Sequence, residues 1–477
     1  MALSREMTLL RLKRMEAALI RSQLANSEVL PADDYDLIRY ALVLARLQAI
    51  RPGAVALERP EHSVVPDVEL ADEPLQTLRE ILLDLLYEPL REQRNLLVRL
   101  AQLRKLADRV RVATRDARLS LLAVHEGQFS ADDLDKEVCH KVLVMIPGGG
   151  GGAGFVYSGF VARMQADGIS PSYIVGASIG ALLGGLMARD RQPDIPALIA
   201  WGKALKAPQI FSQPVVGPAL SLPGLVRLHL RSMDEMLRNA DGSPLRLKDL
   251  AIPYDAVVAG VKASAYASMP KFKPTRLHST RLPMRIAERM VHMLSYFSPK
   301  VATEVLLGAT SETHNVRVVD AIGLSSAIPG VLQYAPWQED EQSVAILHAI
   351  REQQGLASFM DGGMVSNVPA RAAWRSVEAG RIGRRNAYYL AMDCFGPQWG
   401  VGHTWLYPVT QMIQAQLPAQ RPYYDWLVQF SKTPSPVNLL PSEEMFDMAY
   451  SSGWEQAEAV MPQLRAALKP IRMPSLD

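Results

Sequence analysis

Two short apolar runs, each followed by a glycine-bearing turn and a helix-like segment, restrict the fold of this chain more than any other feature. The first run is VLVMI at residues 142–146, and the second is YIV at residues 173–175. Short runs without polar alternation are typical of strands buried on both faces of a parallel sheet. The order strand, helix, strand, helix with short connections predicts an α/β fold with right-handed crossovers, to which residues 256–259 and 388–392 add further strands.

The chain before these runs has a different pattern. Apolar residues recur at three- and four-residue intervals over residues 4–50 and 75–124, and Ser4 is placed to cap the first helix. Between them, residues 51–74 contain prolines and little periodicity, which is typical of a loop or linker. We therefore expect an all-helical N-terminal region over residues 1–135, followed by an α/β domain over residues 136–470.

Composition narrows the class of protein. The 477 residues have a net charge of +2 and average apolar content, so neither disorder nor a multi-span membrane protein is indicated. The two cysteines, Cys139 and Cys394, lack the spacing of a metal site or disulfide framework. The first 21 residues mix leucines with basic residues and lack the apolar core of a secretory signal. We expect a cytoplasmic protein that uses no metal or cofactor and does not bind nucleic acid.

The turn after the second strand carries a serine with the surroundings of a nucleophile. In Gly176-Ala177-Ser178-Ile179-Gly180 the serine lies at a sharp corner where only small neighbours fit. Its hydroxyl then projects from the carboxyl edge of the sheet, where α/β proteins bind ligands. The dipole of the following helix favours negative charge near this hydroxyl. By itself the pentapeptide also fits simple turn chemistry.

The glycine run after the first strand offers unblocked backbone N–H groups to an anion. It spans residues 148–152 and continues as Ala153-Gly154. A phosphate loop needs a following lysine and Ser or Thr, and a dinucleotide fold needs an acid at the end of the next strand. Neither is present, since the next strand ends in the serine turn. An oxyanion hole accounts better for the loop, because the two turns then lie at neighbouring strand ends.

The general base is predicted to be a carboxylate. Asp361 opens the turn Asp361-Gly362-Gly363, where glycines allow close approach by another backbone or a substrate. A carboxylate that accepts directly from a serine hydroxyl can act as its base, although an ordinary Asp-Gly turn is the simpler interpretation. Among the nine histidines, His403 alone follows this motif, which leaves a Ser178, Asp361 and His403 triad as the alternative.

Together the glycine run, the serine turn and the aspartate turn resemble the patatin-like phospholipase family. The segment LSSAIPG at residues 324–330 resembles the stretch before the catalytic aspartate in that family, and NVP at residues 367–369 resembles the stretch after that aspartate. The resemblance covers residues 141–468. It implies a three-layer α/β/α fold with a mainly parallel sheet. In that family, fatty acyl esters of phospholipids or neutral lipids are hydrolysed without metal or organic cofactor.

The resemblance also implies roles for individual residues. Ser178 is the expected nucleophile and Asp361 its base in a catalytic dyad. Where the family usually has Arg or Lys before the last glycine of its loop, this chain has Ala153. The expected oxyanion hole consists of backbone N–H groups of Gly149, Gly150, Gly151 and Gly152. The glycines expected to support these motifs are Gly154, Gly176, Gly180, Gly362 and Gly363.

A lipase must reach substrate in a bilayer or lipid droplet, so an apolar surface flanked by cations is expected. Residues 205–230 are apolar and broken by prolines, and residues 284–307 carry apolar side chains at helical spacing. We interpret them as a lid or docking face for peripheral membrane association, with ordinary packing helices as the alternative. The basic residues just before the second segment are Lys271, Lys273, Arg276 and Arg281.

The N-terminal helices have three candidate roles: packing on the α/β domain, self-association and contact with a membrane. Packing is the expectation that helical amphipathicity favours. A non-catalytic scaffold with the same fold is the remaining alternative, against which the intact serine and aspartate motifs argue.

Overall fold

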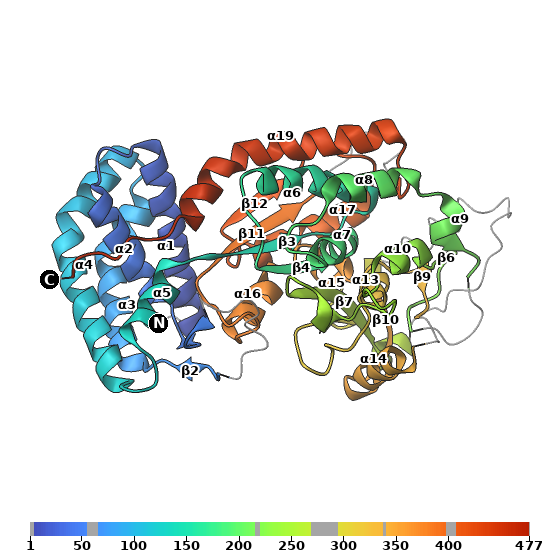
Figure 1. The fold of residues 1–477 in the computed structure, drawn as a ribbon, viewed down its shortest axis with the longest axis horizontal. Helices are drawn as coiled ribbons and strands as arrows, with labels where there is room; N and C mark the ends of the chain where they lie inside the picture. The colour runs from blue at the N-terminus through green and yellow to red at the C-terminus, as the bar shows by residue number, and fades with distance from the viewer. Residues whose placement is uncertain are drawn as a thin grey trace.

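The computed structural model describes residues 4–54, 65–214, 220–268, 294–336, 340–396 and 407–476. A group of N-terminal helices forms one end of the molecule, and a sheet flanked by helices forms the rest (Figure 1). The last long helix, α19 (Glu443–Leu468), runs along the sheet region and returns to the N-terminal helices.

Seven strands form the central sheet, and five of them run parallel. These five lie side by side in the order β12, β11, β3, β4 and β7, while β8 and β10 pair with β7 in the antiparallel direction. The predicted α/β fold with a mainly parallel sheet is confirmed. The strands are β3 (Val142–Pro147), β4 (Tyr173–Ala177), β7 (Tyr254–Lys262), β8 (Ala302–Leu307), β10 (Leu356–Asp361), β11 (Ala387–Asp393) and β12 (Trp426–Gln429).

Helices cover both faces of this sheet, because successive side chains of a strand point to opposite faces. On one face Met145 and Ile174 pack with α6, α7, α13 and α19. On the other face Val144 and Val175 pack with α16 and with the first N-terminal helix. The result is the expected three-layer α/β/α arrangement. The helices are α6 (Val156–Ala166), α7 (Ile179–Ala188), α13 (Val318–Ser325) and α16 (Ala370–Glu378).

A smaller sheet of three strands lies beyond the end of the central one, at the end of the molecule away from the N-terminal helices (Figure 1). Its strand order is β5, β6, β9, with β6 parallel to β9. Short helices surround it. The elements of this part are α8 (Ile195–Ala204), α9 (Ala207–Ile210), β5 (Phe211–Ser212), β6 (Val226–Leu228), α10 (Arg231–Met236), β9 (Leu332–Tyr334) and α14 (Glu341–Gln353).

The N-terminal region is mainly helical, but two details differ from the predicted all-helical region: its first segment is not one helix, and β1 and β2 form a short antiparallel pair. Met7 N donates to the Ser4 hydroxyl, so Ser4 caps the first helix as expected. The chain leaves the helical conformation at Asn26, and Pro31 opens the next helix, because proline is compatible with a helix start but not its interior. The elements are α1 (Arg5–Ala25), α2 (Ala32–Leu44), β1 (Ala49–Ile50), β2 (Val68–Glu69), α3 (Asp72–Tyr87), α4 (Leu96–Val124) and α5 (Ala131–Cys139).

Buried charges join the N-terminal helices to the sheet region. Glu16 of α1 accepts hydrogen bonds from Lys141, which directly precedes β3, at 2.6 Å and from Arg46, in the turn after α2, at 2.5 Å. Burial by itself raises the pKa of Glu16, but Lys141, Arg46 and Arg39 outweigh it and hold the pKa at about 2. Arg39 also donates to the backbone carbonyl of Ala467 in α19 at 2.9 Å. The N-terminal helices therefore pack on the α/β domain through an ion cluster that both parts complete.

The helical spacing predicted for residues 284–307 is wrong for the last part of that segment. Residues 302–307 form strand β8, in which Ala302, Val305 and Leu307 are buried, rather than the end of a helix. Pairing with β7 decides this, because six consecutive backbone pairs outweigh the weak helical spacing of the segment. Residues 284–293 of the same predicted helix lie outside the described residues.

Candidate active site

Ser178 lies at the corner between β4 and α7. Its backbone has φ 54° and ψ −125°, a strained conformation for a residue with a side chain, and its side chain is buried. The flanking glycines are required by close contacts across the turn. A Cβ at Gly180 would lie 2.1 Å from the Pro147 carbonyl oxygen, and one at Gly176 would lie 2.5 Å from the Gly180 carbonyl oxygen. The turn thus has the sharp geometry expected of a nucleophile elbow.

Sheet register brings Asp361 to this corner. Ala177, the last residue of β4, pairs with Val257 of β7, and Asp361, the last residue of β10, pairs with Val258. Strand β8 pairs with the other edge of β7 along residues 256–261, so β4 and β10 share the remaining edge. Because β4 is parallel to β7 and β10 is antiparallel to it, the two strands run toward each other. Their C-terminal ends meet, so residues 183 positions apart in sequence lie side by side: Ser178 and Asp361.

The carboxylate of Asp361 is buried and has few partners. Burial raises its pKa to about 6, while the nearby Ser178 hydroxyl and a hydrogen bond from the Gly363 N–H oppose the rise. Gly363 N donates to Oδ1 at 2.8 Å. Within the described part of the chain, Oδ2 has no hydrogen bond of ordinary geometry. A free oxygen on a carboxylate of raised pKa is suited to accept a proton.

The glycine loop lies beside Ser178. A Cβ at Gly149 would lie 3.0 Å from Cβ of Ser178 and 2.6 Å from Oδ1 of Asn367. Gly151 has φ 53°, and a Cβ there would lie 2.2 Å from the Pro436 carbonyl oxygen. Loop, nucleophile and aspartate turn are therefore packed backbone against backbone, with no space for side chains.

The four N–H groups predicted to form the oxyanion hole divide into two pairs. Gly149 N donates to the Asn367 carbonyl and Gly152 N donates to the Pro436 carbonyl, each at 3.0 Å. Among the described residues no hydrogen bond occupies the N–H groups of Gly150 and Gly151, and both residues line a pocket together with Ser178 and Asp361. The two occupied groups already have acceptors, so Gly150 and Gly151 are the available donors.

The supporting glycines lie at close backbone contacts of the same motifs. A Cβ at Gly154 would meet the side chain of Ile179 at 2.5 Å, and one at Gly362 would meet the Val257 carbonyl oxygen at 2.1 Å. Ala153 is fully buried in the core beneath the loop. A long cationic side chain at this position would enter apolar surroundings in this chain.

Two pockets meet at Ser178. The larger, about 1120 Å³ including its open mouth, is lined almost entirely by apolar side chains of α7, α8, α9, β6 and α10. The smaller, about 780 Å³, contains Asp361. Both include Gly151, Ser178, Ile328 and Leu439. Residues 205–230, predicted as a lid or docking face, contribute Leu205, Ile210 and Leu228 to the lining of the larger pocket.

Three residues that hold this arrangement together were given no role by the sequence. Ser325 accepts a hydrogen bond from Ser178 N at 3.0 Å and donates to the Val257 carbonyl at 2.5 Å. The Asn367 side chain donates to the Gly149 carbonyl at 3.3 Å, and the Tyr157 hydroxyl donates to the Gly148 carbonyl at 2.9 Å. Ser325 and Asn367 belong to the segments 324–330 and 367–369, which resemble the patatin-like family before and after Asp361. Their place in these segments is the sequence signal that could have identified them.

Five residues named in the sequence analysis lie outside the described part of the chain. His403 of the alternative triad lies outside the described residues, as do Lys271, Lys273, Arg276 and Arg281. Across the described ranges, no group of three or more His, Cys, Asp and Glu side chains could hold a metal ion. None of the helices described is both long enough and apolar enough to cross a membrane.

Comparison with known proteins agrees with this geometry. No curated protein matches the chain. Residues 145–374 match the family described as Patatin-like phospholipase, and this range contains the glycine loop, the serine turn and the aspartate turn. The match also agrees with the three-layer fold around a mainly parallel sheet. Residues 145–374 therefore form a patatin-like phospholipase domain within this chain.

Proposed function

We propose that this protein is a serine lipid acyl hydrolase of the phospholipase A or lipase type, in which Ser178 and Asp361 form a catalytic dyad. One observation supports the proposal above all. The ends of β4 and β10 meet on one edge of β7, which brings the hydroxyl of Ser178 to the buried carboxylate of Asp361. A nucleophile with a base in reach is the minimum that ester cleavage requires.

In the first half of the proposed reaction, Asp361 accepts the hydroxyl proton of Ser178 while Oγ attacks the ester carbonyl carbon. Negative charge develops on the carbonyl oxygen, and the N–H groups of Gly150 and Gly151 are the donors best placed to stabilise it. The dipole of α7 supports the same charge. The bond to the alcohol then breaks, the alcohol leaves with the proton from Asp361, and an acyl-serine remains.

In the second half, Asp361 accepts a proton from water as the water oxygen attacks the acyl-serine. Collapse of this intermediate returns the proton to Ser178 and releases the fatty acid. The apolar lining of the larger pocket suits the acyl chain, and the smaller pocket suits the alcohol part. None of these steps needs a cofactor.

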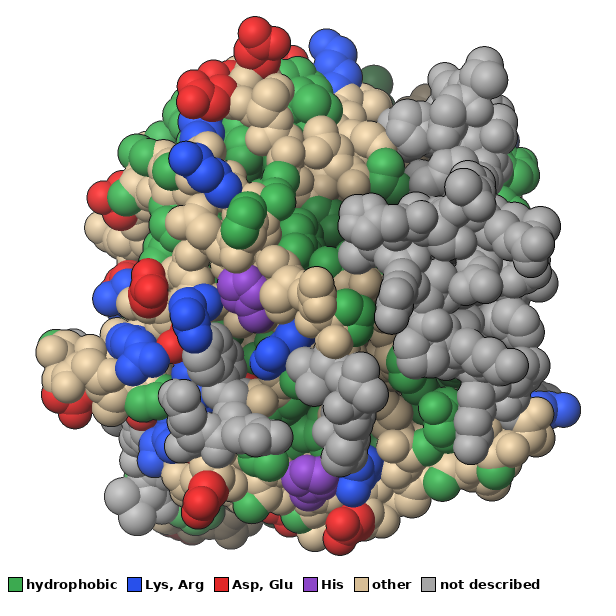
Figure 2. All heavy atoms as spheres, turned by 90° about the vertical axis from the view of Figure 1, so that its right-hand side faces the viewer, with side chains coloured by type: hydrophobic (Ala, Val, Ile, Leu, Met, Phe, Trp, Pro, Cys, Tyr) green, Lys and Arg blue, Asp and Glu red, His purple; other side chains and the backbone are tan. Residues whose placement is uncertain are grey.

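We further propose that the enzyme works as a cytoplasmic protein at the surface of a membrane or lipid droplet. Elements α9 and β6, which line the larger pocket, lie at the end of the molecule away from the N-terminal helices (Figure 1). Figure 2 shows this end, where hydrophobic side chains lie among Lys and Arg side chains, with Asp and Glu side chains mostly toward the edge of the face. Such a surface suits an anionic lipid interface.

Liposome binding tests the docking surface. A variant with Lys271, Lys273, Arg276 and Arg281 replaced by glutamine is compared with wild type on anionic and neutral vesicles. Weaker binding of the variant to anionic vesicles supports docking through these residues, and equal binding excludes it. Size-exclusion chromatography of the wild-type protein with light scattering tests self-association, which was a candidate role of the N-terminal helices: a dimer mass would support it, and a monomer mass would exclude it.

Labelling with a fluorophosphonate probe tests the dyad against its alternatives. The proposal predicts covalent modification of Ser178, its loss in Asp361→Asn, and its retention in His403→Ala. Loss of labelling in a folded His403→Ala variant would favour the triad. No labelling of folded wild type would favour a non-catalytic scaffold.

A further inference from the structure

Ser326 carries a buried hydroxyl close to the nucleophile turn, and this hydroxyl has no hydrogen-bond partner among the described residues. It ends α13, directly after Ser325, whose side chain contacts the backbone of Ser178. Its side chain is 7% exposed and lines the larger pocket together with Ser178. Among the described residues no group forms a hydrogen bond with its Oγ. A buried hydroxyl without a partner is costly, so its presence here requires an explanation.

Two other polar side chains of the same pocket, those of Ser158 and Gln209, are satisfied locally. The hydroxyl of Ser158 donates to the Phe155 carbonyl at 2.7 Å, and the side-chain oxygen of Gln209 accepts from Lys206 N at 2.7 Å. The Ser158 bond lies within the first turn of α6, and the Gln209 bond caps the start of α9. Ser326 makes no comparable bond and stays available to a molecule in the pocket.

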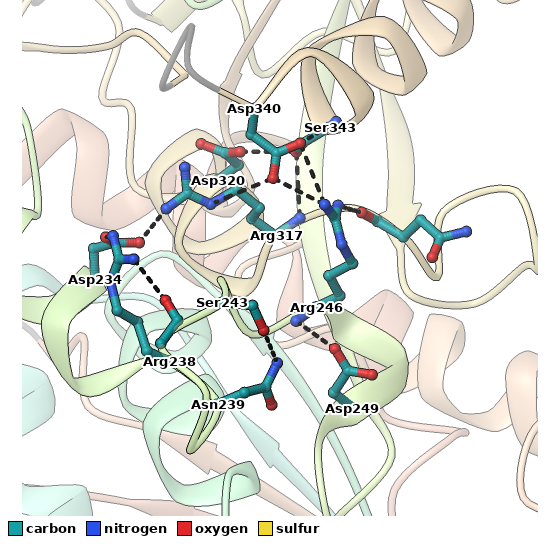
Figure 3. A network of polar contacts seen from close by, with 12 residues as sticks. Asp234, Arg238, Asn239, Ser243, Arg246, Asp249, Arg317, Asp320, Asp340 and Ser343 are labelled. Carbon is teal, nitrogen blue, oxygen red and sulfur yellow. Dashed lines mark hydrogen bonds and ion pairs between the residues drawn. The ribbon is translucent and has the colours of Figure 1, made fainter.

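The position of Ser326 is fixed by a polar network at the other end of α13 (Figure 3). Asp320 accepts from the Tyr334 hydroxyl at 2.7 Å and from the Ser343 hydroxyl at 2.8 Å. Arg317, the residue before the helix, pairs with the carboxylate of Asp234 in α10. The N-cap and first turn of this eight-residue helix are therefore anchored, which restricts where its C-terminal end and Ser326 can lie.

We propose that Ser326 binds the substrate, donating its hydroxyl proton in a hydrogen bond to an oxygen of the fatty acyl ester under attack. The proposal rests on Ser178 acting as nucleophile. In an apolar pocket the ester is the polar part of a lipid, and its oxygens must lie at Ser178 for reaction. Ser326 lines the same pocket as Ser178 and is the next residue after Ser325, which holds the backbone of the nucleophile.

If Ser326 binds substrate, its replacement should lower catalytic activity without lowering the stability of the fold. Ser326→Ala removes a donor that pairs only with substrate, so kcat/KM for p-nitrophenyl esters of butyrate and decanoate should fall about tenfold or more. The melting temperature should not fall, because the variant loses an unpaired buried hydroxyl. Ser452→Ala in α19 is the control: it removes a buried hydroxyl that donates to the Lys432 carbonyl at 2.7 Å and lines neither pocket, so it should keep kcat/KM within about twofold.

Unchanged kcat/KM in Ser326→Ala would overturn the proposal, as would a loss of activity that is matched by a lower melting temperature. The wild-type protein in the same assay distinguishes this failure from that of the proposed function. An active wild type with an equally active Ser326→Ala variant contradicts only the role of Ser326. A folded wild type that cleaves neither ester contradicts the hydrolase itself.

Discussion

The side-chain hydroxyl of Ser325 accepts a hydrogen bond from the backbone N–H of Ser178 at 3.0 Å, across 147 positions of sequence. The same hydroxyl donates to the Val257 carbonyl, and the Ser325 carbonyl accepts from Gly362 N at 3.0 Å. One residue at the end of α13 thus contacts the nucleophile turn, the central strand β7 and the aspartate turn. Ser325 is a positioning residue for both members of the proposed dyad.

Ser325→Ala should therefore lower both activity and stability. The variant leaves the buried N–H of Ser178 without an acceptor, which costs about 1–3 kcal/mol in the free energy of unfolding. Displacement of the nucleophile should lower kcat/KM about tenfold or more, even well below the melting temperature. Thermal denaturation and esterase kinetics at low temperature measure the two effects. A variant that loses stability but keeps wild-type kcat/KM would show that Ser325 acts only on the fold.

The proposed base predicts how activity depends on pH. Burial raises the pKa of Asp361 to about 6, and only its ionised form can accept the serine proton. We expect kcat/KM to rise about tenfold per pH unit below pH 6 and to level off above it. A pH profile with a soluble ester measures this. An inflection near 7 that disappears in His403→Ala would instead indicate a histidine base.

The same pKa predicts a stability cost of the active site. The folded-state pKa of Asp361 lies above its ordinary 3.8, so the folded protein loses stability as pH rises from about 4 to 6. Above pH 6 the loss amounts to about 3 kcal/mol. Asp361→Asn keeps an oxygen for Gly363 N but has no charge to bury. It should be more stable than wild type at pH 8, with a difference that disappears near pH 4 in denaturant titrations. Equal stability at both pH values would contradict the burial of this charge.

Glu16 should be essential for attachment of the N-terminal helices. Glu16→Gln keeps the shape of the side chain but leaves Lys141, Arg46 and Arg39 without their shared anion, at a cost of about 3–5 kcal/mol. Because the pKa of Glu16 is lowered to about 2, its contribution in wild type is present above pH 4.5 and is lost as pH falls toward 2. Chemical denaturation measures the change. Asp132→Asn, in an exposed pair with Lys136, is the control and should have no measurable effect.

Local patterns in the sequence predicted the parts of the fold whose signal is local. The strands around residues 142–146 and 173–175 and the cap at Ser4 were correct because apolar runs and capping residues act over a few positions. Strands β8 and β10 were not predicted, since antiparallel pairing with β7 gives them their conformation. The break at Asn26 was missed because apolar spacing continues across it.

In the candidate site, too, the features with a local sequence signal were predicted, and the features that depend on long-range packing were not. Ser178, Asp361 and the glycine loop were found through glycine turns and a family resemblance, and the structure brings all three together. Which N–H groups remain available depends on the carbonyls of Asn367 and Pro436, which no local pattern reveals. The contact of Ser325 with Ser178 likewise exists only once α13 is packed on β7.

The central claim is that Ser178 and Asp361 together cleave acyl esters of lipids. Fatty acid release from a panel of phospholipids and acylglycerols, with folded Ser178→Ala and Asp361→Asn beside wild type, tests it most directly. We predict release by wild type and a loss of about 10³-fold or more in each variant. Release at the wild-type rate by either folded variant would contradict the dyad.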